Sequence, residues 1–177
     1  MVKELGAKVY RFSLSWPRII PTGIVSNVNN AGIQYYSDLI DELLLNDITP
    51  VVTIYHWDLP QRLQEMVFEH FGDRVKIWTT FNKPRLVCKI DFDEEHQYFS
   101  PLSIYHCCHN IIKAHAEAYH MYKKDFQHTQ HGKIGISIDS LWLEPEDDED
   151  KEASEVDMQL YFGWFAHPIF STIGNYS

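Results

Sequence analysis

The chain has 177 residues, of which 45% are hydrophobic and 23% are charged, values typical of one ordinary globular domain. Such a composition excludes disordered, collagen-like and low-complexity proteins. The net charge of -10 excludes nucleic acid as a partner, because binding to phosphates requires a basic surface. We also expect no membrane contact, since no apolar run approaches the ~20 residues of a membrane span.

Four short runs of β-branched and aromatic residues predict buried strands. They lie at 7–16, 48–60, 74–84 and 132–145. Helical patterns lie between them, because apolar residues recur at spacings of three and four over 30–46 and 103–124. The first stripe is Ile33, Tyr36, Ile40, Leu43 and Leu44, and the second is Ile104, Ile111, Ile112, His115, Tyr119 and Tyr122.

Two connections between these elements complete the pattern. Only about 15 residues separate Asp58 from Arg74, which is just enough for a crossover with two or three helical turns. The acidic run from Glu144 to Glu155 is typical of a solvated loop followed by the start of a helix. Alternating strands and helices predict an α/β fold with a parallel sheet.

Ligands of such folds bind beyond the carboxyl ends of the strands. The predicted strand ends carry Trp16, His56, Trp57, Asn82 and Asp139. Aromatic rings beside hydrogen-bonding groups suit a pyranose, which offers flat apolar faces and a rim of hydroxyls. Buried tryptophans with satisfied polar neighbours would produce the same pattern, so both interpretations stay open.

The segments YRFSLSWPRI, AGIQYYSDLIDELL, VVTIYHWDLPQRL, HFGDRVKIWTTFNKP and GWFAHPIF resemble glycoside hydrolase family 1, the β-glucosidase family. The resemblance is to its animal and insect members, myrosinases included, and runs along nearly the whole chain. It implies a partial (β/α)8 TIM barrel covering roughly the second to fifth strand–helix units, in a single domain over 1–177. We expect the open edges of such a half-barrel to favour self-association.

The family resemblance also assigns roles to four residues. Arg11 matches the arginine that holds the charge of the nucleophile. His56 and Trp57 match the pair that binds and packs the glycone sugar, and Asn82 matches the asparagine that hydrogen-bonds a glycone hydroxyl. The resemblance therefore implies a β-glycoside or sugar as ligand, with no cofactor.

The catalytic machinery departs from the family pattern. A retaining glycosidase uses two carboxyl groups ~5–5.5 Å apart, one as nucleophile and one as acid/base. The family acid/base glutamate is replaced by Lys83, whose ammonium is a poor base and repels the developing positive charge. The family nucleophile belongs to a later strand than those found in this chain. We therefore expect no intact catalytic residue and no activity of this chain, a thioglucosidase variant included.

Three functions remain in view. Descent implies hydrolysis of O-glycosyl bonds in β-glycosides. The alternatives are a non-catalytic carbohydrate-binding homologue, weak in its binding, and a degenerate gene product. The N-terminal residues lack an apolar signal core, so we expect no export signal in the chain, although a longer parent protein would be secreted as many animal relatives are.

The cysteines suggest a third kind of site. Three cysteines are too few for a disulfide framework. Cys88 is interpreted as a small packing residue rather than a nucleophile, because no histidine with an orienting partner can be named for it. The sequence HCCH at 106–109 raises the hypothesis of a metal site. Neighbouring helical residues point in different directions and the spacing is not that of a zinc finger, so we expect no metal.

Overall fold

The computed structural model describes residues 2–23, 27–55, 64–90 and 102–171. The chain forms two compact units, each built from two stretches of sequence. The first unit comprises Met1–Asn82 and Glu117–Ile136, and the second comprises Lys83–Ala116 and Ser137–Ser177. The single domain expected from the sequence over 1–177 stays a prediction.

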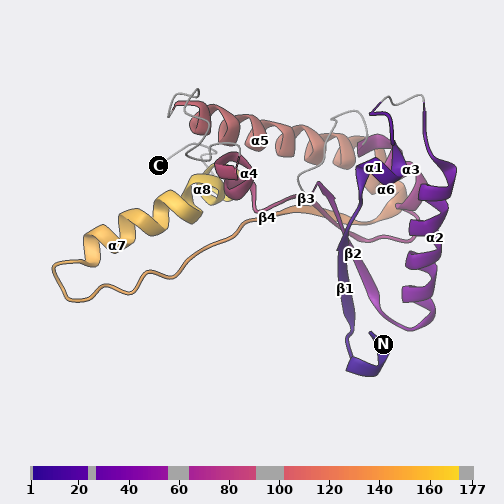
Figure 1. The fold of residues 1–177 in the computed structure, drawn as a ribbon, viewed down its shortest axis with the longest axis horizontal. Coiled ribbons are helices and arrows are strands. Elements are labelled where there is room, and N and C mark those ends of the chain that lie inside the picture. The colour runs from indigo at the N-terminus through magenta and orange to yellow at the C-terminus, as the bar shows by residue number, and fades with distance from the viewer. Residues whose placement is uncertain (1, 24–26, 56–63, 91–101, 172–177) are drawn as a thin grey trace. The chain divides into compact units, whose positions relative to one another are not determined.

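The helices and strands alternate along the chain (Figure 1). Those before Lys83 are η1 (Lys3–Leu5), β1 (Val9–Ser13), α1 (Trp16–Ile19), α2 (Asn30–Leu45), β2 (Thr49–Tyr55), α3 (Gln64–Phe71) and β3 (Ile77–Asn82). Those after it are α4 (Pro84–Ile90), α5 (Leu102–Met121), η3 (Tyr122–Phe126), α6 (Gln127–Gln130), β4 (Lys133–Ser137), α7 (Lys151–Met158), η4 (Gln159–Gly163) and α8 (Trp164–Phe170). None of the helices in the described ranges is both long and apolar enough to span a bilayer.

The four strands form one sheet in the order β1-β2-β3-β4. β1 and β3 both run parallel to β2, with Arg11 opposite Val51 and Thr53 opposite Thr79. β4 adds to β3 at its beginning, where the amide of Lys133 donates to the carbonyl of Lys76 at 2.8 Å. Each predicted range contains one of the four strands but extends beyond it: Trp16 belongs to α1, Pro84 belongs to α4, and Leu141 lies in an irregular segment after β4.

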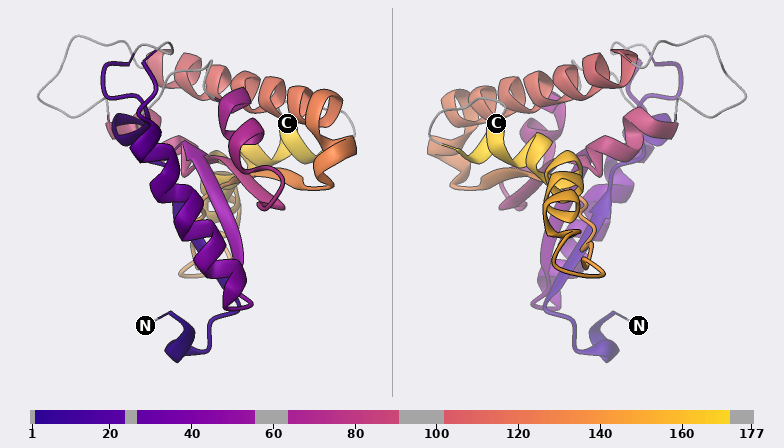
Figure 2. Two further views of the ribbon diagram at one scale, coloured as in Figure 1. Left: turned by 90° about the vertical axis from the view of Figure 1, so that its right-hand side faces the viewer. Right: turned by 90° about the vertical axis from the view of Figure 1, so that its left-hand side faces the viewer.

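Helices cover one face of this sheet. α2 lies alongside β1 and β2 in both views of Figure 2, and Phe12 stacks on Tyr36 at 6.1 Å between ring centroids. The hydrophobic core includes Val52, Ile54 and Trp78, which are at most 1% exposed. The predicted apolar stripe of α2 is confirmed at its centre, although its last residue Leu44 is 40% exposed.

Phe68 of α3 holds the central aromatic cluster of the first unit. It is fully buried, and its ring meets those of Trp78, Tyr122 and Phe126 at centroid distances of 5.1, 4.8 and 5.4 Å. The short helix α3 between β2 and β3 therefore contributes to the core of the first unit and also connects the two strands.

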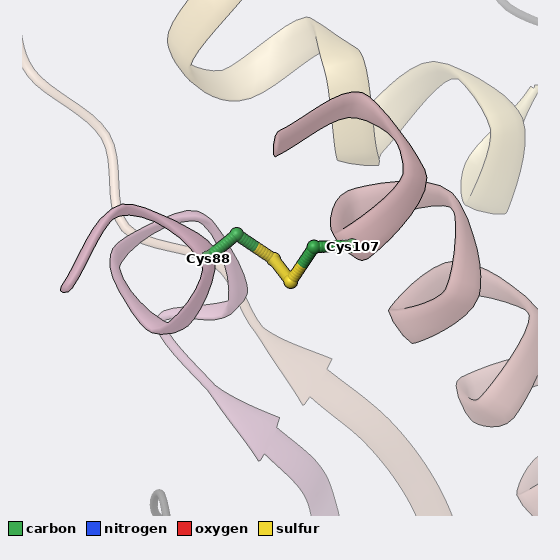
Figure 3. The surroundings of a disulfide bond; sticks show 2 residues. All are labelled: Cys88 and Cys107. Carbon is green, nitrogen blue, oxygen red and sulfur yellow. A yellow bond between two sulfur atoms is a disulfide. The ribbon is translucent and has the colours of Figure 1, made fainter. Parts of the chain in front are cut away.

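The second unit contains a disulfide that the sequence reasoning did not anticipate. Cys88 of α4 and Cys107 of α5 form a disulfide, while Cys108 is a buried free thiol (Figure 3). Cys88 is fully buried, as expected of a packing residue, but the disulfide was not expected from the sequence. The fold brings the Cα atoms of Cys88 and Cys107, which are 19 residues apart in sequence, to within 5.7 Å of each other.

Truncating Phe68 should strongly destabilise the first unit. Removing a buried phenylalanine ring typically costs about 3–5 kcal/mol, because three aromatic neighbours lose their packing partner. Urea unfolding followed by circular dichroism should show this loss for Phe68→Ala. The matched substitution Leu45→Ala, at a side chain that is 80% exposed, should change the free energy of unfolding little.

His115 should make the stability of the second unit depend on pH. Burial lowers the pKa of His115 from 6.5 to about 4. Below pH 6.5 the unfolded chain binds a proton at His115 more readily than the folded chain does. The free energy of unfolding is therefore at its full value above pH 6.5 and decreases as pH falls from 6.5 to 4. The loss amounts to about 3 kcal/mol at most.

The free energy of unfolding, measured between pH 7 and pH 4, should therefore fall more steeply for the native chain than for His115→Asn. Carboxylates and the remaining histidines titrate in both proteins, so the difference between the two curves isolates His115. Parallel curves would contradict the prediction.

Candidate functional site

Arg11 joins three strands of the sheet through its guanidinium group. Its Nε donates to Oγ1 of Thr53 on β2 at 3.0 Å, and its Nη2 donates to Oδ1 of Asn82 on β3 at 2.7 Å. Both acceptors are largely buried, with Thr53 2% and Asn82 9% exposed. The structure thus brings together two of the residues predicted to bind a glycone, Arg11 and Asn82.

The alternation of side chains places Arg11 on the sheet face opposite the core. Arg11, Thr53 and Thr79 share one face through the strand register, whereas Val52 and Trp78 point to the helix-covered face. A cation and two hydroxyls are therefore arranged on the face opposite the core helices, as polar ligand binding requires.

An aromatic pair stands at the carboxyl ends of β2 and β3. Tyr55 and Phe81 are opposite each other in the register, and their rings meet edge to face at a centroid distance of 5.2 Å. Sequence reasoning missed these two residues and Thr53. The period-two alternation in VVTIY and TTF could have identified them, because it assigns them to the face of Arg11.

The tryptophans predicted at the strand ends do not form one group. Trp16 is 2% exposed and its indole N–H donates to the carbonyl of Ile54 at 2.8 Å, so it belongs to the core. For Trp16, the interpretation as a buried tryptophan with a satisfied polar neighbour is confirmed. His56 and Trp57 lie outside the described residues. Asp139 belongs to the second unit.

Lys83 follows Asn82 directly and has an exposed side chain. Its backbone adopts the left-handed conformation, with φ of 51°. Its amide donates to the carbonyl of Ser137 at 2.8 Å, and its carbonyl accepts from the amide of Leu86 at 3.0 Å at the start of α4. An ammonium group here can donate hydrogen bonds and attract anions, but it cannot deliver and then recover a proton as a carboxyl group does.

A cavity lies in the second unit, away from these residues in the sequence. It has a volume of about 580 Å³ between α5 and the segment α7–η4, and its walls include Tyr105, His109, Val156 and Leu160. Across the described part of the chain, no three His, Cys, Asp or Glu side chains are grouped so as to hold a metal ion.

Known proteins resemble this chain in sequence. It is 43% identical to human lactase-like protein over 198 residues, covering 97% of the chain and 35% of that protein. It is 41% identical to myrosinase 1 of the aphid Brevicoryne brassicae, covering 96% of the chain and 42% of the relative. The chain thus spans well under half the length of these relatives.

Solved structures agree with this resemblance. An aphid myrosinase superposes with a TM-score of 0.83 at 41% identity, covering 96% of the chain and 42% of that structure. A rice β-glucosidase superposes with a TM-score of 0.85 at 36% identity, covering 98% of the chain and 43% of that structure. The four parallel strands therefore correspond to part of the (β/α)8 barrel of these proteins, which confirms the predicted fold class.

The model of the family described as "Glycosyl hydrolase family 1" matches residues 1–177. Because the match covers every residue and the relatives agree with it, the chain belongs to glycosyl hydrolase family 1.

Proposed function

We propose that these 177 residues carry the part of a β-glycosidase site that recognises the glycone and that they do not cleave the glycosidic bond. The observation that carries the proposal is the hydrogen-bonded group of Arg11, Thr53 and Asn82, in which Arg11 and Thr53 lie on the face opposite the core helices. The side-chain oxygen of Asn82 accepts from Arg11, which ties the end of β3 to β1.

The aromatic pair supports a sugar as the ligand. Tyr55 and Phe81 lie at the carboxyl ends of the same strands that carry Thr53 and Asn82. Apolar rings next to fixed hydrogen-bonding groups match the two surfaces of a pyranose, its C–H face and its hydroxyl rim.

The lysine at position 83 is the reason why we expect no hydrolysis. A retaining mechanism needs one carboxyl group to protonate the leaving group and then activate water. The ammonium group of Lys83 fills that sequence position, and its charge opposes the oxocarbenium-like transition state. We propose hydrolysis of O-glycosyl bonds in β-glycosides as the ancestral reaction, in line with the relatives named lactase-like protein, myrosinase and β-glucosidase.

Binding of methyl β-glucoside should be weak and should depend on Asn82. Few hydrogen bonds and one aromatic wall correspond to a millimolar dissociation constant, or about 4 kcal/mol. Titration with methyl β-glucoside, followed by saturation-transfer NMR, should show binding to the native chain and a several-fold loss in Asn82→Ala.

The matched control is Asn46→Ala. Asn46 caps the end of α2, immediately before β2, so it lies at the edge of the sheet opposite the strand ends. This variant should bind methyl β-glucoside as the native chain does. Equal binding by both variants would contradict a site at Asn82, and no binding by the native chain would contradict the proposed function.

Restoring the family acid/base by Lys83→Glu should not produce turnover in the 177-residue chain. The family's nucleophile comes from a later strand, so a second carboxylate would still be needed for the displacement. Release of 4-nitrophenol from 4-nitrophenyl β-glucoside should stay at the background rate for both proteins. Hydrolysis by the variant, abolished again by Lys83→Gln, would refute this account.

We also propose that the chain self-associates through its sheet edges. In the described part of the chain, β1 and β4 each have a strand neighbour on one side only. Val9 on β1 is 54% exposed, which leaves an apolar side chain on an edge strand.

Light scattering after size-exclusion chromatography should therefore give a mass at least twice that of the chain. A charge on an edge strand opposes edge-to-edge pairing, so Val9→Lys should shift the protein toward the monomer. Leu5→Lys, at an 81% exposed position before the sheet, should leave the mass unchanged. A native chain that is monomeric at all concentrations would contradict self-association.

A further inference from the structure

The disulfide in the second unit joins the two helices that follow β3. Figure 3 shows Cys88 on α4 and Cys107 on α5 facing each other across the space between the helices. The Cα atoms are 5.7 Å apart, within the range that a disulfide bridges without moving the backbone. The third cysteine, Cys108, is the neighbour of Cys107 on the same helix and is fully buried as a thiol.

The geometry of α5 separates the two neighbouring cysteines. Successive residues of an α-helix point in directions about 100° apart, so only one of them faces α4. Cys107 is half-buried and faces Cys88, whereas Cys108 is 0% exposed in the interior of the unit. Pairing of Cys88 with Cys108 would require α5 to rotate and to bring a buried position out of the core.

Burial also makes Cys108 a poor participant in disulfide exchange. It raises the pKa of the Cys108 thiol from 9.0 to about 11, although the nearby positive charge of Arg85 acts in the opposite direction. Exchange requires a thiolate with access to a sulfur of the bridge. Cys108 has neither the charge nor the access, so an existing bridge is protected from rearrangement.

The bridge fixes a helix that is too short to be stable alone. α4 has seven residues, whereas isolated helices need roughly 12–15 to form in water. Its other described ties are the hydrogen bond from Lys83 to Ser137 and the guanidinium of Arg85, whose carbon lies 3.5 Å from the ring centroid of Tyr161. The covalent link holds the middle of α4, one turn after Lys83.

We infer that Cys88–Cys107 is the specific native pairing of this protein, that it fixes α4 behind Lys83, and that the chain matures in an oxidising compartment. In this step the two thiols form one S–S bond and lose two protons and two electrons. The acceptor is the disulfide of oxidised glutathione or of a thiol oxidoreductase, which is reduced to two thiols. The reducing conditions of a cytosol would keep the cysteines as thiols.

Counting thiols in the denatured protein tests the pairing. Protein secreted from eukaryotic cells should react with one equivalent of Ellman's reagent before reduction and three after it. Because no protease separates Cys107 from Cys108, serine variants are needed to assign the partner. Cys108→Ser should have no free thiol, and Cys107→Ser should have two.

Two results would overturn the pairing. A Cys107→Ser protein without free thiols and monomeric on a non-reducing gel would show that Cys108 replaces Cys107. Three free thiols in the secreted native chain would show that no bridge forms. The compartment is tested by producing the same chain in a cytosol and blocking its thiols at lysis. Three thiols are expected there, and a single one would overturn the link to an oxidising compartment.

Hydrogen exchange tests the role of the bridge in α4. Amides of 85–90 should exchange at least tenfold faster in Cys107→Ser than in the native chain. Cys108→Ser makes the same chemical change one residue along the helix and should leave these rates unchanged. Equal protection in all three proteins would overturn the role in fixing α4, whether or not the chain binds sugars.

Discussion

Arg11 is the side chain on which the polar face of the sheet depends. It donates from β1 to Thr53 on β2 and to Asn82 on β3, so one guanidinium ties together strands that are up to 71 residues apart in sequence. Parallel strands make such a convergence possible, because all their carboxyl ends lie at one edge of the sheet. The helices α2 and α3 pack on the other face of the sheet, where Tyr36 stacks on Phe12 and Phe68 meets Trp78 edge to face, so the face of Arg11 is left to polar side chains.

The order of strands and helices could be predicted from the sequence because apolar residues recur at a regular spacing in the helices and are concentrated in short runs in the strands. The three- and four-residue spacing around Tyr36 and Ile40 places α2 within a residue of its actual bounds. The same reasoning overextended the strands, since aromatic residues such as Trp16 and Trp142 follow strands as well as form them. Trp16 turns into the core to bond Ile54, a tertiary contact that no local pattern records.

The site was predicted in part for a similar reason. Arg11 and Asn82 were identified through family motifs, whereas Thr53, Tyr55 and Phe81 depend on which face of each strand is buried. The disulfide could not be predicted, because the pairing of Cys88 with Cys107 rather than Cys108 depends on the rotation of α5 about its axis. Such a choice between adjacent cysteines is a property of the tertiary structure alone.

The backbone of Lys83 is left-handed, and the conformational cost of this backbone does not depend on the charge of the side chain. With φ of 51°, any residue that has a Cβ pays a conformational cost on the order of 1 kcal/mol, whatever its charge. The hydrogen bonds that hold the position come from the main chain, to Ser137 and from Leu86, and the side chain is exposed. A change between glutamate and lysine is therefore nearly neutral for folding. In evolutionary terms, the charge at position 83 can be reversed by a single nucleotide change without passing through an unstable intermediate.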